Sequence, residues 1–412
     1  MQSVKRKHII VVILFLAGMT VFAQSADMSL YIEDISRTDT TVFDILATVE
    51  DVRNQNLTGF GDFYNAALRI LLYRLPNFTG PRERLAIHDA ARIILRGLAA
   101  EKYTAAAANI WRVAQEFDVV HEYNDGTLLS EALVTLGQID AKYYVPHIIL
   151  RLENFNADQT NDLQTRRKIQ IAMKGAVEAL ETLKDPAAIK PIFYASIGWY
   201  DPDIRGFAAA ALPKIMDDPA TIITEIIQSP FNNADVKFTA WKEMLKTNAP
   251  NESKAKVAAA TLETSYSYVS HRVDEQNVLR FMRISAIDAM RRMGAPDDSV
   301  YSYIARAYRD AFNTPNVDTE VVNLVISTLS AIRTEKAVDL LTEFLSELNV
   351  KRRSGPWGNT ERDIMQFILP AIANTGTQSR QTMLLLSSIQ RSDAYTGAEQ
   401  GWAGSALRAL VK

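Results

Sequence analysis

Residues 203–215 read DIRGFAAAALPKI, and this stretch decides the fold. Its apolar side chains belong to Ile204, Phe207, Ala208, Ala211, Leu212 and Ile215. Their spacing of i, i+3, i+4, i+7, i+8 and i+11 places them in one stripe, which is typical of an amphipathic α-helix. Pro213 lies within the stripe and has no backbone N–H to donate, so we predict that it kinks or ends this helix.

A second helix repeats this pattern further along the chain. Ile204-Arg205 opens the first stripe, and Met282-Arg283 stands at the same offset in the second. The second stripe consists of Val278, Phe281, Met282, Ser285, Ala286, Ala289, Met290 and Met293. Gly294 follows directly, and because glycine is favoured just after the end of a helix, we predict that this helix ends at residue 293.

Weaker copies of the stripe recur along most of the chain. If one small or apolar residue of each copy is taken as its anchor, the anchors are Ala90, Leu129, Ala176, Ala208, Ala240, Ala286, Val325, Ile368 and Ala403. Neighbouring anchors lie 32 to 47 residues apart, about 39 on average, a period typical of helical repeats. Because one helix pair cannot bury its own stripe, the pattern predicts stacked pairs whose alanines let neighbouring helices approach closely.

Two segments resemble HEAT or HEAT-like repeats. Residues 185–192 read DPAAIKPI and lead into the stretch at 203–212. Residues 133–140 read LVTLGQID and are followed by Pro146 in the next expected helix. The resemblance implies an all-α fold, namely an α-solenoid or superhelix of stacked antiparallel helix pairs.

The resemblance covers residues 82–412 and is sharpest at 132–215 and 278–294. In HEAT repeats, an aspartate and an arginine near the turn form a structural ladder between repeats. Asp203 and Arg205 match these positions, so the resemblance implies that both residues are structural.

The repeat array is assigned to residues 82–412, and residues 24–81 to a linker followed by N-terminal capping helices. A helix is predicted in this first part from Phe63, Ala66, Ala67, Ile70, Leu71 and Tyr73. Its expected role is that of a cap, because the end of a stacked array needs a polar outer face.

Residues 1–23 have the layout of a secretory signal peptide. Lys5, Arg6 and Lys7 precede the apolar run at 9–22, and Ala23 is a small residue suited to cleavage. The run has 14 residues, whereas a membrane-spanning helix needs roughly 20. We therefore expect a bacterial protein that is exported to the periplasm or secreted, and that is not integral to a membrane after cleavage. The alternative is a chain anchored by an uncleaved N-terminal segment.

The composition excludes several classes of function. The chain has no cysteine among its 412 residues, which excludes disulfide frameworks, thiolate zinc sites, iron–sulfur clusters and cysteine nucleophiles. Its formal net charge of −3, together with export, argues against a nucleic-acid partner.

No motif for catalysis or metal binding is found in the sequence. The histidines beyond the expected signal are scattered: His88, His121, His147 and His271. One class of HEAT-like hydroxylases builds a di-iron site from repeated His-Glu pairs, but the single pair His121-Glu122 cannot supply enough ligands. We therefore expect no catalytic residue, no metal and no cofactor.

One segment stands out as a candidate partner-binding loop. Lys351, Arg352 and Arg353 precede Trp357, which lies between a proline and a glycine. Arginine and tryptophan are enriched at binding hot spots, and loops often carry binding sites. The alternative is a connector whose Trp357 folds back on a neighbouring repeat.

A second candidate is the stretch that contains Tyr266, Tyr268, His271 and Arg272. It lies near an expected connection between helices, and its alternative role is packing. The fold itself favours a non-catalytic scaffold or adaptor that binds protein partners on its surface, because stacked helix pairs present long binding surfaces. The alternative function is an enzyme or small-ligand carrier with a site in the groove.

Overall fold

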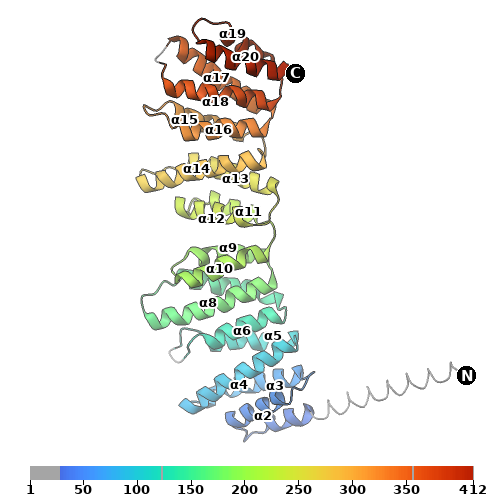
Figure 1. Cartoon of the computed structure of the whole chain (residues 1–412). Helices are drawn as coiled ribbons and strands as arrows, with labels where there is room; N and C mark the ends of the chain where they lie inside the picture. The colour runs from blue at the N-terminus through green and yellow to red at the C-terminus, as the bar shows by residue number, and fades with distance from the viewer. Residues whose placement is uncertain (1–27, 122–123, 355–356, 412) are drawn as a thin grey trace, which may run out of the picture. The chain divides into compact units, whose positions relative to one another are not determined.

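The computed structural model describes residues 28–121, 124–354 and 357–411. Within these ranges the chain forms helices and the turns that join them, and no β-strand (Figure 1). The prediction of an all-α fold is therefore confirmed. The expected signal peptide at 1–23 lies outside the described residues.

The chain divides into two compact units between Met216 and Asp217. After a helical segment at residues 28–36, the first unit contains α2 (Val42–Asn54), α3 (Gly61–Arg74), α4 (Pro81–Ala100), α5 (Ala107–Glu116), α6 (Thr127–Gln138), α7 (Val145–Ala157), α8 (Leu163–Leu183), α9 (Ile189–Ile197) and α10 (Pro202–Ile215). Short 3-10 turns precede α5, α7 and α9 and follow α3, namely η2 (Thr104–Ala106), η3 (Lys142–Tyr144), η4 (Pro186–Ala188) and η1 (Leu75–Asn77).

The second unit contains ten helices in the part of it that the structure describes. They are α11 (Ala220–Gln228), α12 (Ala234–Lys246), α13 (Asn251–Ser267), α14 (Val273–Met293), α15 (Val300–Phe312), α16 (Thr319–Ile332), α17 (Glu335–Ser354), α18 (Asn359–Thr375), α19 (Arg380–Gln390) and α20 (Gly397–Val411).

Each unit consists of helix pairs in two layers. In the first unit, α3 packs against α4, α5 against α6, α7 against α8, and α9 against α10. The second helices of these pairs contact one another in chain order from α4 to α10, and the first helices form the other layer. The second unit repeats this scheme from α11/α12 to α19/α20. Stacked pairs of this kind are the packing of an α-solenoid.

The anchors of the sequence repeat all lie on the second helix of a pair. Each of the nine is fully buried, with an exposed fraction of 0%: Ala90, Leu129, Ala176, Ala208, Ala240, Ala286, Val325, Ile368 and Ala403. These helices form the layer in which α4, α6, α8 and α10, or α12 to α20, contact their neighbours directly. The predicted repeat therefore marks the seam along which successive pairs bury their apolar stripes.

The contact between α6 and α8 shows why small residues are needed at this seam. A side-chain carbon added at Gly175 would lie 2.6 Å from the backbone of Ser130, and one added at Gly137 would lie 2.9 Å from the Cα of Ala179. Both distances are shorter than a carbon–carbon contact allows. The two helices can approach this closely only because both positions are glycine.

Ion pairs connect residues that lie one repeat apart. Examples are Arg92 with Glu131, Arg166 with Asp201, and Arg309 with Glu347, separated by 39, 35 and 38 residues. These separations match the period of the sequence repeat. The pairs therefore form rungs between successive helix pairs.

The residues of the ladder differ from those that the HEAT-like resemblance implied. Neither Asp203 nor Arg205 forms an ion pair with any described residue, and the Nε atom of Arg205 is buried without a hydrogen-bond partner. The rung at this level joins Arg166 to Asp201 at 2.6 Å, and Arg166 also donates to the carbonyl of Trp199 at 3.1 Å. Asp201 occupies the N-cap position of α10, but its carboxylate does not accept a capping hydrogen bond from that helix. The carboxylate is therefore available to pair with Arg166.

Three local predictions can be compared with the helix bounds. α10 ends at Ile215, so Pro213 lies in its last turn, and Gly294 follows the end of α14 with a positive φ of 93°. Both predicted helix ends are confirmed. The helix predicted from Phe63 is α3, but its apolar face is rotated: Tyr73 is 79% exposed, whereas Tyr64 is buried, because α3 packs against both α2 and α4.

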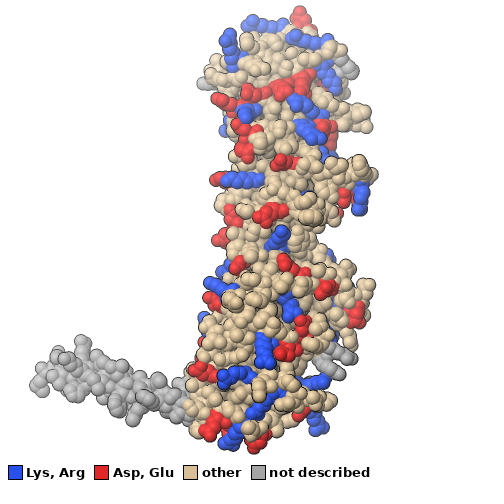
Figure 2. Space-filling model, turned by 180° about the vertical axis from the view of Figure 1, so that it is seen from behind, with Lys and Arg blue, Asp and Glu red and all other residues tan. Residues whose placement is uncertain are grey.

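The charged side chains of each unit are mixed in sign over the face shown in Figure 2. In the described part of the chain, every helix is too short or too polar to cross a membrane.

Candidate functional site

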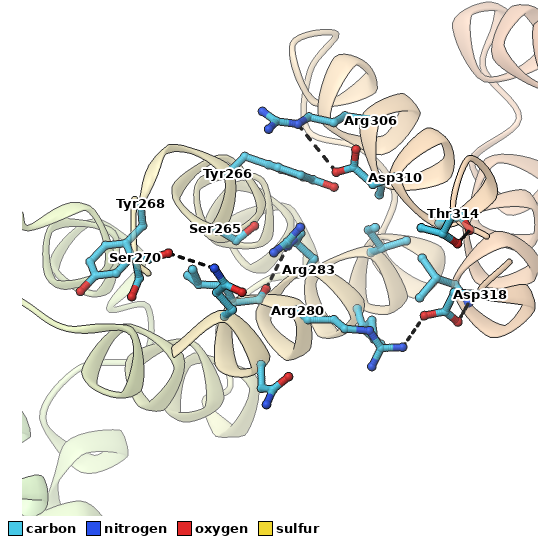
Figure 3. A pocket seen from close by; sticks show the side chains of 18 of the residues that line it. Ser265, Tyr266, Tyr268, Ser270, Arg280, Arg283, Arg306, Asp310, Thr314 and Asp318 are labelled. Carbon is cyan, nitrogen blue, oxygen red and sulfur yellow. Dashed lines mark hydrogen bonds and ion pairs between the residues drawn. The ribbon is translucent and has the colours of Figure 1, made fainter. Parts of the chain in front are cut away.

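The second unit contains a cavity of about 770 Å³ bounded by α13, α14, α15 and the start of α16 (Figure 3). Its lining combines three arginines, two aspartates and two tyrosines: Arg280, Arg283, Arg306, Asp310, Asp318, Tyr266 and Tyr268. We call it the arginine–tyrosine cavity. The residues come from two successive helix pairs, so the stacking of the pairs builds the cavity.

Tyr266 is the aromatic side chain that contacts two arginines of the cavity. It lies in the last turn of α13, and its ring is placed between two arginines in Figure 3. The guanidinium carbon of Arg283 lies 4.7 Å from the ring centroid, and that of Arg306 lies 4.5 Å from it. Tyr303 also stacks on the ring, with centroids 6.0 Å apart. Cation–π attraction at these distances holds the ring in place.

The hydroxyl group of Tyr266 is buried and lacks a hydrogen-bond partner among the described residues. Burial raises the pKa of this hydroxyl, and the nearby charge of Arg283 opposes the shift only in part. Arg283 approaches the oxygen but does not meet hydrogen-bond geometry there. The hydroxyl therefore keeps its proton at neutral pH and remains a hydrogen-bond donor.

Arg283 differs from the other two arginines in its charge partner. Arg280 pairs with Asp318, and Arg306 pairs with Asp310 at 3.8 Å. The Nε atom of Arg283 donates to the carbonyl of Leu279 at 3.2 Å, and no carboxylate of the described residues pairs with its guanidinium. The terminal nitrogens of Arg283 are thus available to an anion, and the backbone holds the group in position.

The rim of the cavity carries amide side chains from the first turns of α14. Gln276 donates to the carbonyl of Ser270 at 3.1 Å, which fixes the connection between α13 and α14. Asn277 follows it and is exposed. Tyr268 belongs to the same connection, and the ammonium group of Lys237 lies 5.7 Å from the centroid of its ring.

Lys237 is a buried cation with a structural role. Only 2% of it is exposed, and its ammonium group donates to the carbonyls of Ile227 and Ser229 at the end of α11. Burial lowers its pKa. Its donors are directed at carbonyls that α11 leaves unpaired, so it serves as a cap of that helix.

The structure places only part of the second predicted candidate in the cavity. Tyr266 and Tyr268 line it, whereas His271 and Arg272 do not. Arg272 is 70% exposed and pairs with Asp274 at 2.6 Å. Arg283 and Arg306 were missed as site residues. Arg283 did carry a signal, because it stands at the repeated arginine position after Met282.

The first predicted candidate, Lys351, Arg352, Arg353 and Trp357, is called the basic segment below. The prediction that its three cations lie in a loop is wrong, because they form the last turn of α17. Cations are favoured at this end of a helix, and Lys351 pairs with Glu361 of α18 at 2.7 Å.

Trp357 of the basic segment contacts the last repeat. Its ring meets that of Tyr395 edge-on, with centroids 6.4 Å apart, and the guanidinium carbon of Arg352 lies 5.0 Å from it. Arg352 also donates to the carbonyl of Ala394 at 2.9 Å. These contacts are those of a connector that folds back on its neighbour. Arg353 is exposed, and its role in partner binding stays a prediction.

The end of this connector is fixed by a buried carboxylate. Glu399 is 1% exposed and accepts hydrogen bonds from the N–H and hydroxyl of Thr396 at 2.8 and 3.0 Å. Burial alone would raise its pKa, but these hydrogen bonds and the charge of Arg352 outweigh it, so the pKa is lowered. Glu399 therefore remains ionised and compensates the charge of Arg352.

No protein-family model matches this chain, and no curated protein matches it either. In the described part of the chain, no three His, Asp or Glu side chains are grouped so that they could hold a metal ion. Of the pair His121-Glu122, Glu122 lies outside the described residues.

Proposed function

We propose that this chain is a non-catalytic, exported scaffold or adaptor that binds protein partners on the surface of its HEAT-like helix pairs, with the arginine–tyrosine cavity as its recognition site. The observation that carries the proposal is the ring of Tyr266 between Arg283 and Arg306 in the lining of a cavity. Tyrosine and arginine are enriched at binding hot spots. Guanidinium groups stay protonated at physiological pH, so they bind and orient a ligand and do not exchange protons with it.

A small-ligand carrier or enzyme is the second candidate, and the size of the cavity favours it. A volume of about 770 Å³ lies within the range of small-molecule pockets. Native mass spectrometry of the full chain, purified from a bacterial host, separates the two functions. A bound small molecule that is retained by the wild type and lost after Tyr266→Ala supports the carrier.

A photo-cross-linking residue at position 277 tests the scaffold directly, since Asn277 is exposed on the rim of the cavity. The matched control is position 291, which is exposed on the same helix and does not line the cavity. We expect a protein to be captured only from position 277. That protein, purified separately, should bind the full chain and lose affinity after Tyr266→Ala. Equal capture from both positions contradicts the proposal.

The proposal also includes export, which can be tested by determining the first residue of the mature protein. Sequencing of the protein from the periplasmic fraction should find Gln24 as the first residue, since the expected cut follows Ala23. A chain that keeps Met1 and stays in the membrane fraction supports the anchored alternative instead.

A further inference from the structure

We infer that the arginine–tyrosine cavity recognises a single carboxylate, held by the terminal nitrogens of Arg283 and the hydroxyl of Tyr266. In the intended partner the carboxylate belongs to a polypeptide, as an acidic side chain or a C-terminus. This inference rests on the proposed function and names the chemical group that the cavity selects.

Two features make Arg283 suited to bind an anion: its guanidinium group is held in position, and no carboxylate of the described residues pairs with it. Its Nε–H is bonded to the carbonyl of Leu279, one turn earlier on α14, so the guanidinium group does not rotate freely. The remaining N–H groups form the planar fork that binds a carboxylate with two parallel hydrogen bonds. The side chain is partly buried, which strengthens its attraction for a negative charge.

Tyr266 supplies an independent observation in favour of a ligand. Most buried polar groups in proteins have a hydrogen-bond partner, and a buried group without one needs an explanation. The hydroxyl of Tyr266 is such a group, and Figure 3 shows the ring that carries it between Arg283 and Arg306. A carboxylate bound to Arg283 would accept a hydrogen bond from this hydroxyl and satisfy both side chains.

The charge of the lining favours a monoanion over a phosphate dianion. Three arginines face two aspartates, which leaves one net positive charge. Arg280 and Arg306 are already paired, so Arg283 alone carries the uncompensated charge. Asp310 and Asp318 would repel the second charge of a phosphate.

The exposed rim favours a carboxylate that is part of a polypeptide. Asn277 is exposed beside the opening, and its amide can both donate to and accept from a peptide backbone. A free carboxylic acid has no peptide backbone, so the amide of Asn277 would then form hydrogen bonds only with water.

Titrations of the full chain with defined probes test the inference. Nitrogen-labelled arginine side chains report binding at Arg283 by NMR. The probes are N-acetyl-glutamate N-methylamide, its glutamine counterpart, acetyl-trialanine with a free or an amidated C-terminus, glutarate and inorganic phosphate. We expect saturable shifts of the Arg283 signal with the carboxylate peptides, and none with the glutamine and amidated peptides.

Variants define what overturns the inference. Arg283→Gln and Tyr266→Phe should each weaken binding of the glutamate peptide by about tenfold or more, the effect of losing a hydrogen bond to a charged group. Arg283→Lys keeps the charge but loses the fork, so it should weaken binding by a smaller factor. Arg291→Gln, outside the cavity, should not change it. Unchanged affinity in Arg283→Gln, or binding of phosphate equal to that of the carboxylates, contradicts the inference.

The same data separate this inference from the proposed function. If a purified partner protein binds near residue 277 and Arg283→Gln leaves its affinity unchanged, the scaffold stands and carboxylate recognition falls. If glutarate binds as well as the peptides and depends on Arg283, carboxylate recognition stands and the carrier replaces the scaffold.

Discussion

The arginine–tyrosine cavity and the basic segment are built from the same kinds of side chain, but these side chains differ in their partners. In the basic segment, Arg352 lies against Trp357 and close to the buried carboxylate of Glu399. In the cavity, Arg283 lies against Tyr266 and pairs with no carboxylate of the described residues. In the first cluster the charge of Arg352 is compensated within the chain, although the Nε1 atom of Trp357 is buried without a hydrogen-bond partner among the described residues. In the second, the charge of Arg283 is uncompensated and the hydroxyl of Tyr266 has no such partner either. An arginine beside an aromatic ring therefore marks a candidate site only when its charge is left uncompensated.

The largest effect is expected for Glu399→Ala, which removes the charge partner of the basic segment. We expect the free energy of unfolding to fall by about 3 kcal/mol, because Arg352 loses its compensation and α20 loses the hydrogen bonds between Glu399 and Thr396. Urea denaturation of the full chain measures this. The exposed Glu320→Ala is the control and should change stability by less than about 0.5 kcal/mol. A loss equal to that of the control contradicts the comparison.

Trp357→Ala should have the next largest effect on stability. Trp357 is half-buried against Tyr395 and Arg352, so its removal should lower the free energy of unfolding by about 2 kcal/mol. Partner binding at the cavity should not change. If binding falls while stability is kept, the basic segment contacts a partner after all and the comparison fails.

The fold could be predicted because its cause is local and repeated. Ala208 and Ala286 are buried at the seam for the same reason as the seven other anchors, and this reason is visible in the spacing of apolar residues alone. The ion pairs that join successive helix pairs could not be predicted in the same way. Whether Arg166 pairs with Asp201 or Arg205 with a neighbour depends on which helix ends meet, and the spacing does not contain this information.

The candidate site was only partly predicted, for a related reason. Tyr266 drew attention as part of a tyrosine-containing stretch, and Arg283 as a member of the repeat. Their importance comes from Arg306, which follows on the next helix pair, and from the absence of a carboxylate near Arg283 in the described residues. The basic segment stood out more clearly in the sequence because its cations are consecutive, although Glu399 compensates Arg352 from the last helix.

The pH dependence of stability offers a smaller effect that concerns the basic segment alone. The pKa of Glu399 is lowered in the folded chain, so the unfolded chain binds more protons as the pH falls below the ordinary value of 4.5. The stabilisation is complete above that value and is lost as the pH falls through the lowered pKa. Glu399→Gln should therefore destabilise the chain at neutral pH, and its difference from the wild type should narrow in acid. A difference that is independent of pH shows that the charge of Glu399 does not act as proposed.

The smallest expected effect gives the sharpest contrast, because the same substitution should lower stability in the basic segment and should not lower it in the cavity. The hydroxyl of Tyr395 donates to Asn349 at 2.8 Å, so Tyr395→Phe should lower the free energy of unfolding by about 1 kcal/mol. Tyr266→Phe removes a buried hydroxyl without a partner, so it should leave stability unchanged or raise it by up to about 1 kcal/mol. Only the cavity variant should also lose affinity for the glutamate peptide. If Tyr266→Phe raises the free energy of unfolding and weakens peptide binding, the unpartnered hydroxyl of Tyr266 serves the ligand at a cost in stability. Equal destabilisation by Tyr395→Phe and Tyr266→Phe would mean that Tyr266 only packs against its neighbours.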